Sequence, residues 1–198
     1  MSERPVVFAI TGASGAPYAV GLLRALVDLK QPVQLIVSTH GWRLLDTETG
    51  IGDLGALQAK TGGKAWSSVV EVFDDKDRGA APASGSALTS GMVICPCSMG
   101  TLAAIAAGTS RSLIERAADV TLKERRRLVL VPRETPLSSI HLENMLRVTN
   151  AGAIVMPAAP GFYHRPSTID ELVAFMVARA LDHLGIEHSV GRRWDPKA

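Results

Sequence analysis

The feature that most constrains the fold is a continuous apolar run near the N-terminus, residues 5–11, which a Gly/Ser turn follows. A strand buried on both faces produces such an unbroken run, because neither side of it meets water. Residues 16–30 then repeat apolar side chains at helical spacing, and residues 33–38 form a second apolar run. This order predicts a parallel β-loop-α-β unit with a right-handed crossover.

Strand-like and helix-like segments continue to alternate as far as residue 184. Further strands are predicted at residues 69–73, 91–95, 128–131 and 153–156. Helices are predicted at residues 41–47, 53–60, 99–107, 113–125, 137–150 and 169–184, and a loop at residues 80–91. We therefore predict an α/β fold: a Rossmann-like, doubly wound parallel sheet with helices on both faces, a three-layer sandwich. Residues 1–185 are expected to form one domain and residues 186–198 a C-terminal tail.

Composition and charge exclude several classes of protein. The chain has 198 residues, of which 46% are hydrophobic but only 5% aromatic, so the core must be aliphatic. The net charge of +2 is too small to indicate nucleic-acid binding. No apolar run approaches the roughly 18 residues of a membrane span, and residues 6–10 are too short for a signal-peptide core. We expect a soluble, cytoplasmic protein.

The loop between the first strand and the first helix is a candidate phosphate site. Residues 12–15 read Gly-Ala-Ser-Gly, and glycines allow a tight turn whose N–H groups approach an oxyanion at the helix N-terminus. The dinucleotide fingerprint and the P-loop motif are both absent. The second strand ends at Ser38, with no acidic residue there to bind a ribose hydroxyl. These observations favour a mononucleotide.

Polar residues also follow other predicted strands. Ser38 follows the second strand, Ser98 follows residues 91–97, and Arg133 and Glu134 follow the strand at 128–131. Because open α/β sheets bind ligands at the carboxyl ends of their strands, these side chains should converge on one site.

A second group of residues suggests another anionic ligand. Arg116 and Lys123 are seven residues apart on one predicted helix and therefore share a face. Tyr163 lies in a proline-bounded loop, and Arg179 is expected to interrupt the apolar face of the last helix. Each alone is more often a surface residue or ion pair, but together these donors suit a phosphate.

Two other motifs are interpreted as structural. Cys95 and Cys97 lack the second ligand pair of a zinc site, so we predict small buried residues after a strand. The acidic run at residues 74–77 has no matching second acidic cluster, and we predict a solvated turn. No metal is therefore expected.

The ordered set of motifs resembles the UbiX-type flavin prenyltransferases, a branch of the flavin-binding, cysteine-decarboxylase-like flavoproteins, from about residue 6 to 184. The segments that carry the resemblance are ITGASGA at 10–16, LDTET at 45–49, ASGS at 83–86, CPCSMGTL at 95–102, RAADV at 116–120, LKERR at 122–126, LVPRETPL at 130–137, MP at 156–157 and FYHRP at 162–166. One position departs from the family pattern: Arg78 stands where members generally carry an apolar or aromatic side chain.

The resemblance implies a metal-independent transfer of a dimethylallyl group from dimethylallyl monophosphate to N5 and C6 of reduced FMN. The product, prenylated FMN, would serve a UbiD-type decarboxylase. The resemblance also implies a homo-oligomer, a dodecamer, with its sites between subunits. Ubiquinone biosynthesis is a reasonable pathway.

Roles of individual residues follow from the resemblance. FMN would be held by Gly12, Ala13, Ser14, Ser38, Ser98, Met99, Gly100, Thr101 and Arg133. The phosphate of the prenyl donor would be held by Arg116, Lys123, Tyr163 and Arg179. The catalytic residues would be Ser14, near the reacting edge of the flavin, and Glu48 and Glu134, which would manage protons.

Two alternatives remain open from the sequence. An FMN-dependent decarboxylase of a cysteinyl substrate would share the fold, but His40 is a poor substitute for that family's catalytic histidine. A non-catalytic FMN carrier or partner subunit would not need a second anion site.

Overall fold

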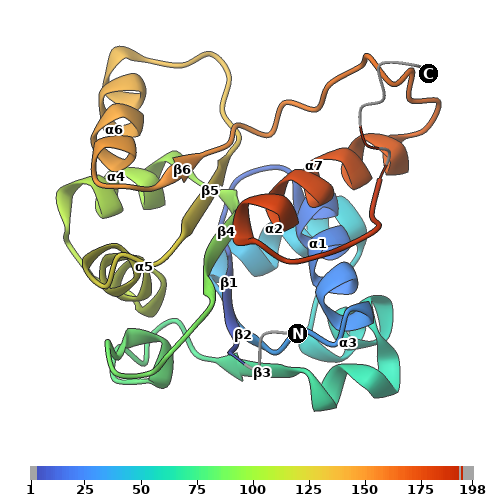
Figure 1. Ribbon diagram of the computed structural model, residues 1–198, viewed down its shortest axis with the longest axis horizontal. Helices are drawn as coiled ribbons and strands as arrows, with labels where there is room; N and C mark the ends of the chain where they lie inside the picture. Colours follow the sequence, from blue (N-terminus) through green and yellow to red (C-terminus); the bar gives the residue numbers. More distant parts are fainter. Residues whose placement is uncertain (1–3, 192, 194–198) are drawn as a thin grey trace.

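In the part of the chain that the structure describes, six parallel strands form a single sheet in the order β3-β2-β1-β4-β5-β6 (Figure 1). The computed structural model describes residues 4–191 and 193. The strands are β1 (Val6–Ile10), β2 (Val33–Val37), β3 (Val70–Phe73), β4 (Gly91–Cys97), β5 (Leu128–Pro132) and β6 (Ile154–Val155). This order is that of the doubly wound Rossmann topology, so the predicted fold class is confirmed.

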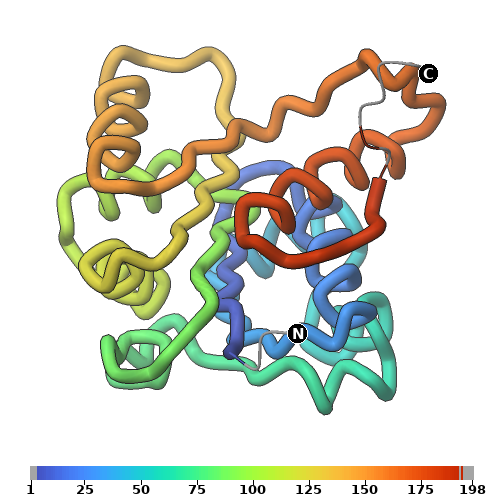
Figure 2. The backbone as a smooth tube through the Cα atoms, viewed as in Figure 1, coloured from blue at the N-terminus to red at the C-terminus, as the bar shows by residue number. Residues whose placement is uncertain are grey.

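Helices cover both faces of the sheet (Figure 1). One face carries α1 (Ala16–Asp28), α2 (Thr39–Thr49), α3 (Leu54–Thr61) and α7 (Ile169–Leu184). The other carries α4 (Met99–Ala107), α5 (Leu113–Lys123) and α6 (Ser139–Asn150). The connection between β6 and α7 runs from the edge of the sheet to the layer that contains α1 and α7 (Figure 2).

The central strand β1 contributes to two hydrophobic cores. Phe8 and Ile10 point into the core under α1 and α7, whereas Val7 and Ala9 point into the core under α4 and α5. All are at most 1% exposed. Each large aliphatic or aromatic side chain buried in this way contributes roughly 1.5–3 kcal/mol to folding. The unbroken apolar run in the sequence is the direct result of this two-sided burial.

Serine side chains decide where several helices begin. The Ser38 hydroxyl accepts a hydrogen bond from the Gly41 N–H, and the Ser138 hydroxyl accepts one from the His141 N–H. An N-cap serine satisfies an N–H group that has no partner within the helix. Helix α2 therefore begins at Thr39, two residues before the predicted start, and α6 begins at Ser139, two residues after it.

The two cysteines lie within a strand and not after it, which corrects the prediction. Strand β4 continues through Cys97, and its register with β5 shifts between Ile94 and Cys97. Both thiols are free and buried. Burial raises the pKa of the Cys95 thiol to about 12, so this thiol is protonated and inert at neutral pH.

The strand order places a topological switch point between β1 and β4. The chain crosses from β1 toward β2 on one side of it and reaches β4 on the other. Ligands of open α/β sheets bind outside the carboxyl ends of the strands at such a point. None of the helices among the described residues is long and apolar enough to span a membrane.

Candidate active site

A polar cavity of about 220 Å³ lies at the switch point. Its lining combines residues that follow three neighbouring strands: Gly12 after β1, Ser38 after β2 and Ser98 after β4. Thr11, Thr101 and Ser112 complete the hydroxyl-bearing lining. Four of the residues predicted to bind the cofactor, Gly12, Ser38, Ser98 and Thr101, are therefore brought together here.

Three helices begin at this cavity, and each begins with a serine cap. Ser38 caps α2, Ser98 caps α4 and Ser112 caps α5. Helix N-termini carry unsatisfied N–H groups and a partial positive charge, so they favour an anion. The cavity is consequently suited to a phosphate group, although two carboxylates, Asp75 and Glu115, also line it.

Both carboxylates are engaged by donors of the protein. The Ile114 N–H donates to Asp75 Oδ1 over 3.0 Å. Glu115 accepts from the Arg111 N–H at 2.7 Å and from Arg111 Nη2 at 3.1 Å. Partial burial alone would raise the pKa of Glu115, but the hydrogen bonds from Arg111 and Thr109 hold it below its usual range. The negative charge of Asp75 and Glu115 is therefore partly offset by donors of the protein itself.

Thr11 joins the ends of β1 and β4 beside the cavity. Its hydroxyl donates to the Pro96 carbonyl over 2.9 Å and accepts from the Ser98 N–H over 2.8 Å. The residue is only 2% exposed. Thr11 thus sets the position of Ser98, and with it the start of α4, relative to β1.

We expect Thr11→Val to weaken both the fold and ligand binding. Valine keeps the shape but leaves the Ser98 N–H without its partner, which costs about 1–3 kcal/mol in the free energy of unfolding. Thr61→Val is the matched control, because buried Thr61 bonds only to the Leu57 carbonyl within α3. Urea unfolding and FMN titration of both variants test this; equal FMN affinity in the two would contradict it.

Glu48 occupies the N-terminus of α1. Its Oε2 accepts hydrogen bonds from the Gly15 N–H at 2.9 Å and the Ala16 N–H at 2.8 Å. Helix α1 has no side-chain cap of its own and no acidic residue in its first turn. A carboxylate supplied by α2 therefore occupies the N–H groups of Gly15 and Ala16, whereas Gly12 of the same loop lines the neighbouring cavity.

The surroundings of Glu48 keep it ionised. Partial burial opposes ionisation, but hydrogen bonds from Gly15, the Ser14 side chain and Ala16, with the nearby charge of Arg133, hold the pKa of Glu48 below its usual range. The Nε of Arg133 is buried and has no hydrogen-bond partner among the described residues. The structure thus groups Ser14, Glu48 and Arg133, with one buried donor left for a ligand.

Other predicted residues lie close to this group or turn away from it. Ala13 is buried in the same loop, and Gly100 is exposed in the first turn of α4. The Met99 side chain packs into the core under α4, so its contact with a ligand would be through its backbone. Glu134 is exposed after β5, where its Oε1 accepts from the Thr135 N–H at 3.0 Å.

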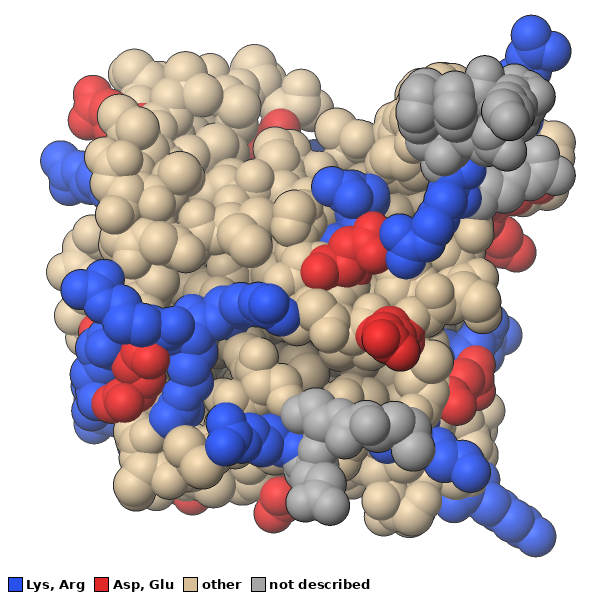
Figure 3. Space-filling model, in the orientation of Figure 1, with Lys and Arg blue, Asp and Glu red and all other residues tan. Residues whose placement is uncertain are grey.

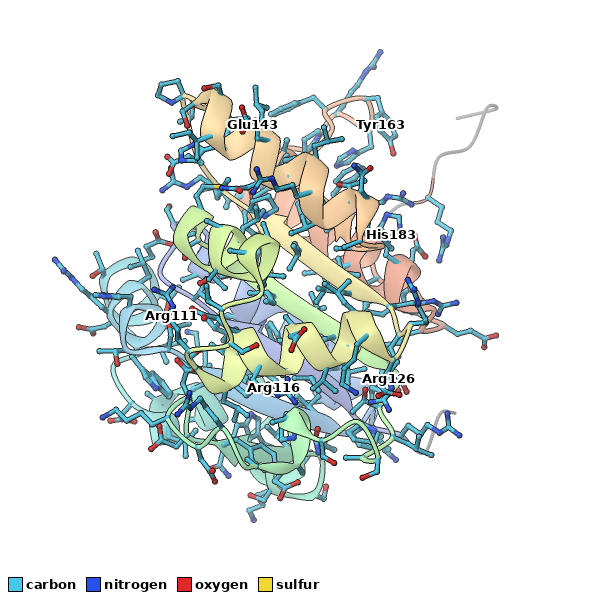
Figure 4. The ribbon with its side chains drawn as sticks, turned by 90° about the vertical axis from the view of Figure 1, so that its left-hand side faces the viewer. Arg111, Arg116, Arg126, Glu143, Tyr163 and His183 are labelled. Atoms are coloured by element: carbon cyan, nitrogen blue, oxygen red, sulfur yellow. The ribbon has the colours of Figure 1, made fainter. Side chains whose placement is uncertain are left out.

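The residues predicted to bind the second anion are not gathered within one chain. Arg116 is paired with Asp119 on α5, and Lys123 with Glu124 at the end of that helix. Tyr163 is 60% exposed in the loop before α7. Figure 4 shows Arg116 on α5 and Tyr163 well away from that helix, near the top of the view.

The prediction for Arg179 was wrong in one respect. Arg179 does not interrupt the apolar face of α7, because it points outward, 3.3 Å from Asp182, while Ala180 and Leu181 are buried. The acidic run at 74–77 also differs from expectation. Asp75 is not merely solvated, since its backbone carbonyl accepts from the Leu113 N–H at 2.7 Å and its Oδ1 accepts from the Ile114 N–H at the start of α5.

Sequence reasoning missed part of the cavity lining. Thr11, His40 and Ser112 were not assigned to the site, and Asp75 was set aside as a turn residue. A signal for Ser112 was present, because serine followed three residues later by Glu115 is the pattern of a helix start.

Two other expectations concern residues outside the cavity. Arg78 is exposed and does not belong to the cavity lining, so its departure from the family pattern leaves this part of the site unaltered. Among the described residues, no group of His, Cys, Asp and Glu side chains could hold a metal.

Comparison with known proteins shows the family of the chain. The Flavoprotein family matches residues 1–181. "Flavin prenyltransferase UbiX" of Pseudomonas aeruginosa is 50% identical, over 96% of this chain and 93% of the relative. The crystal structure of AnUbiX (PadA1) in complex with FMN and dimethylallyl pyrophosphate is 41% identical, covers 98% of both chains and has a TM-score of 0.89.

A third similarity comes from Escherichia coli O157:H7. The structure described as a dodecameric FMN-dependent UbiX-like decarboxylase is 42% identical, covers 96% of this chain and 99% of its own, and has a TM-score of 0.88. The cysteine decarboxylase TvaF is only 12% identical at a TM-score of 0.61, so it shows the fold alone. The chain belongs to the Flavoprotein family and, within it, to the UbiX-type flavin prenyltransferases.

Proposed function

We propose that this protein transfers a dimethylallyl group from dimethylallyl monophosphate to N5 and C6 of reduced FMN, and that the prenylated FMN serves a UbiD-type decarboxylase. The observation that carries the proposal is the cavity at the switch point, where three serine-capped helices begin. The identity of the flavin and of the prenyl donor is inferred from a relative of this chain, because the AnUbiX structure holds FMN and dimethylallyl pyrophosphate.

The residues present fit FMN. Its phosphate would lie in the 220 Å³ cavity, held by the hydroxyls of Ser38, Ser98 and Thr101. The flavin ring would then extend toward Ser14, Glu48 and the unpartnered Nε of Arg133. When bound, reduced FMN supplies the nucleophilic atoms that accept the prenyl group.

Two carboxylates would manage protons near the flavin. Glu48 is held ionised by hydrogen bonds from Gly15, Ser14 and Ala16 and by the charge of Arg133, so it can stabilise positive charge as it stands, and taking up a proton would weaken those hydrogen bonds. Glu134 is exposed, next to Arg133, and can exchange protons with solvent. Ser14 bridges the loop to Glu48.

Cationic residues would stabilise the departing phosphate. Fixed donors aimed at developing negative charge are a large source of catalysis. Arg116 and Lys123 lie on α5, whereas Tyr163 and Arg179 lie in and after the β6–α7 connection. Because one chain keeps these pairs apart, the complete phosphate site would be assembled between subunits.

The surface of α6 suits such an assembly. Ile140, Leu142 and Leu146 are 66%, 53% and 60% exposed, and Leu137 just before the helix is 42% exposed. Several large exposed apolar side chains on one helix are typical of a protein interface. With the dodecameric relative, it supports a homo-oligomer of twelve subunits. The protein is further proposed to be cytoplasmic, with residues 1–185 as its flavin-binding domain.

Anaerobic incubation with reduced FMN and dimethylallyl monophosphate tests the reaction. Mass spectrometry should find a flavin heavier by one prenyl unit, and inorganic phosphate should be released in equal amount. A parallel incubation with the diphosphate separates the two donors. An unchanged flavin mass with both donors would overturn the proposed function, and carbon dioxide release from a cysteinyl peptide would favour the decarboxylase alternative.

Comparison of FMN with riboflavin tests the cavity separately. Riboflavin lacks the phosphate, so it should bind at least about 100-fold more weakly if two or more charge-assisted hydrogen bonds are lost. Equal affinities for FMN and riboflavin would show that the cavity does not bind the FMN phosphate, whatever reaction the protein performs.

A further inference from the structure

The C-terminal end of α5 lies against the loop of residues 83–87. An added Cβ on Gly85 would stand 2.5 Å from Glu124 Oε1 and 2.9 Å from Lys123 Nζ. Lys123 and Glu124 form an ion pair at this point. The ammonium group of Lys123 therefore lies beside Gly85, and a side chain at position 85 would displace it.

Arg126 holds this loop in place. Its Nη2 donates to the Gly85 carbonyl at 2.5 Å, and its Nη1 donates to the Ala87 carbonyl at 2.9 Å. The same Nη1 also donates to Thr89 Oγ1 at 3.5 Å. Figure 4 shows Arg126 beyond the end of α5, and in Figure 3 basic side chains gather on this side of the molecule with acidic ones among them.

We infer that Arg126 is a positioning residue: by fixing the carbonyls of Gly85 and Ala87, it holds the surface on which Lys123 lies and so aims the Lys123 ammonium at the phosphate of the prenyl donor. The inference rests on the proposed function, in which Lys123 binds that phosphate. Arg126 itself touches neither ligand in this scheme.

The choice of arginine has a physical reason. The guanidinium is a rigid, planar fork that binds two carbonyls at once, whereas a lysine presents a single point charge on a flexible stem. Lysine at position 126 could reach one carbonyl but not hold both. The charge near Glu124 would be kept, so Arg126→Lys separates the effect of geometry from that of charge.

Steady-state kinetics with the full-length protein test the inference. Arg126→Ala should raise the KM for dimethylallyl monophosphate about tenfold, as expected for the loss of one charge-assisted contact to the phosphate. The dissociation constant of FMN should stay within about twofold, since the cavity is formed by other elements. The KM of Arg126→Lys for dimethylallyl monophosphate should fall between those of the wild type and Arg126→Ala.

The matched control is Arg24→Ala. Arg24 also donates two hydrogen bonds to a backbone carbonyl, that of Lys60, at 3.3 and 3.0 Å, but it joins α1 to α3. The KM of Arg24→Ala for dimethylallyl monophosphate should equal that of the wild type. An equal rise in both variants would show a general loss of stability and overturn the inference.

Gly85→Ala provides an independent route to the same effect. Its Cβ should displace the Lys123–Glu124 pair and raise the same KM with FMN affinity unchanged. Gly79→Ala is its control, because a Cβ there meets nothing closer than Asp77 Oδ1 at 3.5 Å. An unchanged KM in Gly85→Ala would count against a role for this surface.

Amide hydrogen exchange tests the positioning step without any turnover. The loop's own hydrogen bonds include the Ser84 N–H to the Ala81 carbonyl and the Ala87 N–H to the Ser84 carbonyl. Arg126→Ala should speed exchange at residues 84 and 87, whereas Arg24→Ala should not. If exchange is faster in Arg126→Ala but the wild type transfers no prenyl group, the proposed function alone is refuted. If exchange is unchanged in Arg126→Ala, the positioning role is refuted.

Discussion

Replacing Glu48 with glutamine is expected to lower kcat by about 100-fold or more, the range typical of a lost acid or base group, while FMN affinity changes little. The carboxylate accepts from both the Gly15 N–H and the Ala16 N–H through a single oxygen. Glutamine keeps the shape and one acceptor oxygen, but it has no negative charge and cannot take up a proton. The substitution should therefore lower kcat more than it lowers the affinity for FMN.

The same substitution should change how stability depends on pH. The pKa of Glu48 is lowered in the folded protein, so its stabilising contribution is fully present above the ordinary glutamate pKa of about 4.3. It is lost as the pH falls through the lower, folded-state pKa. Wild type should thus lose more stability between neutral and acid pH than Glu48→Gln does.

Asp53→Asn is the matched control for Glu48→Gln. Asp53 Oδ1 also accepts from a backbone N–H at a helix N-terminus, that of Ala56 in α3, at 2.8 Å, but it lies outside the candidate site. Single-turnover rates of flavin prenylation and thermal unfolding from pH 7 to pH 3 should be measured for both variants. Wild-type turnover in Glu48→Gln would exclude Glu48 from proton transfer.

Gly41→Ala is expected to be the most damaging change to the cavity that leaves every polar side chain intact. A Cβ at this position would stand 2.5 Å from the Ile10 carbonyl oxygen and 3.0 Å from its carbon. Those atoms belong to the end of β1, which cannot move without disturbing the central sheet. Helix α2 must shift instead, and Ser38 with it, at a cost of about 1–3 kcal/mol for an overpacked site.

FMN binding should fall with the displacement of Ser38. The Ser38 N–H donates to the same Ile10 carbonyl at 3.0 Å, so the clash acts directly on the strand end that borders the cavity. Isothermal titration with FMN and urea unfolding measure the two effects.

Gly55→Ala, in the first turn of α3, is the control for Gly41→Ala, because its nearest neighbour is Asp53 Oδ1 at 3.4 Å. Normal FMN affinity in Gly41→Ala would show that the cavity tolerates movement of α2.

The sequence by itself was enough to determine the fold class, because a parallel sheet covered on both faces leaves unbroken apolar runs at its strands and helical spacing between them. It also indicated Ser38 and Ser98, since residues that follow the strands of such a sheet share one edge. The family motifs added Glu48, which local pattern alone could not assign, and they named a ligand for the second anion group that the residues had already suggested.

Only the tertiary structure decided what each residue contacts. The loop at 12–15 looked like the phosphate site, yet Glu48, more than thirty residues away, accepts its N–H groups. Asp75 looked solvated, yet it caps α5 from 39 residues away. These pairings depend on how α2 and α5 pack on the sheet, which leaves no periodic trace in the sequence. Packing therefore decides that Glu48 occupies the N–H groups at the end of the glycine loop, and that Gly12 shares a cavity with the starts of α2, α4 and α5.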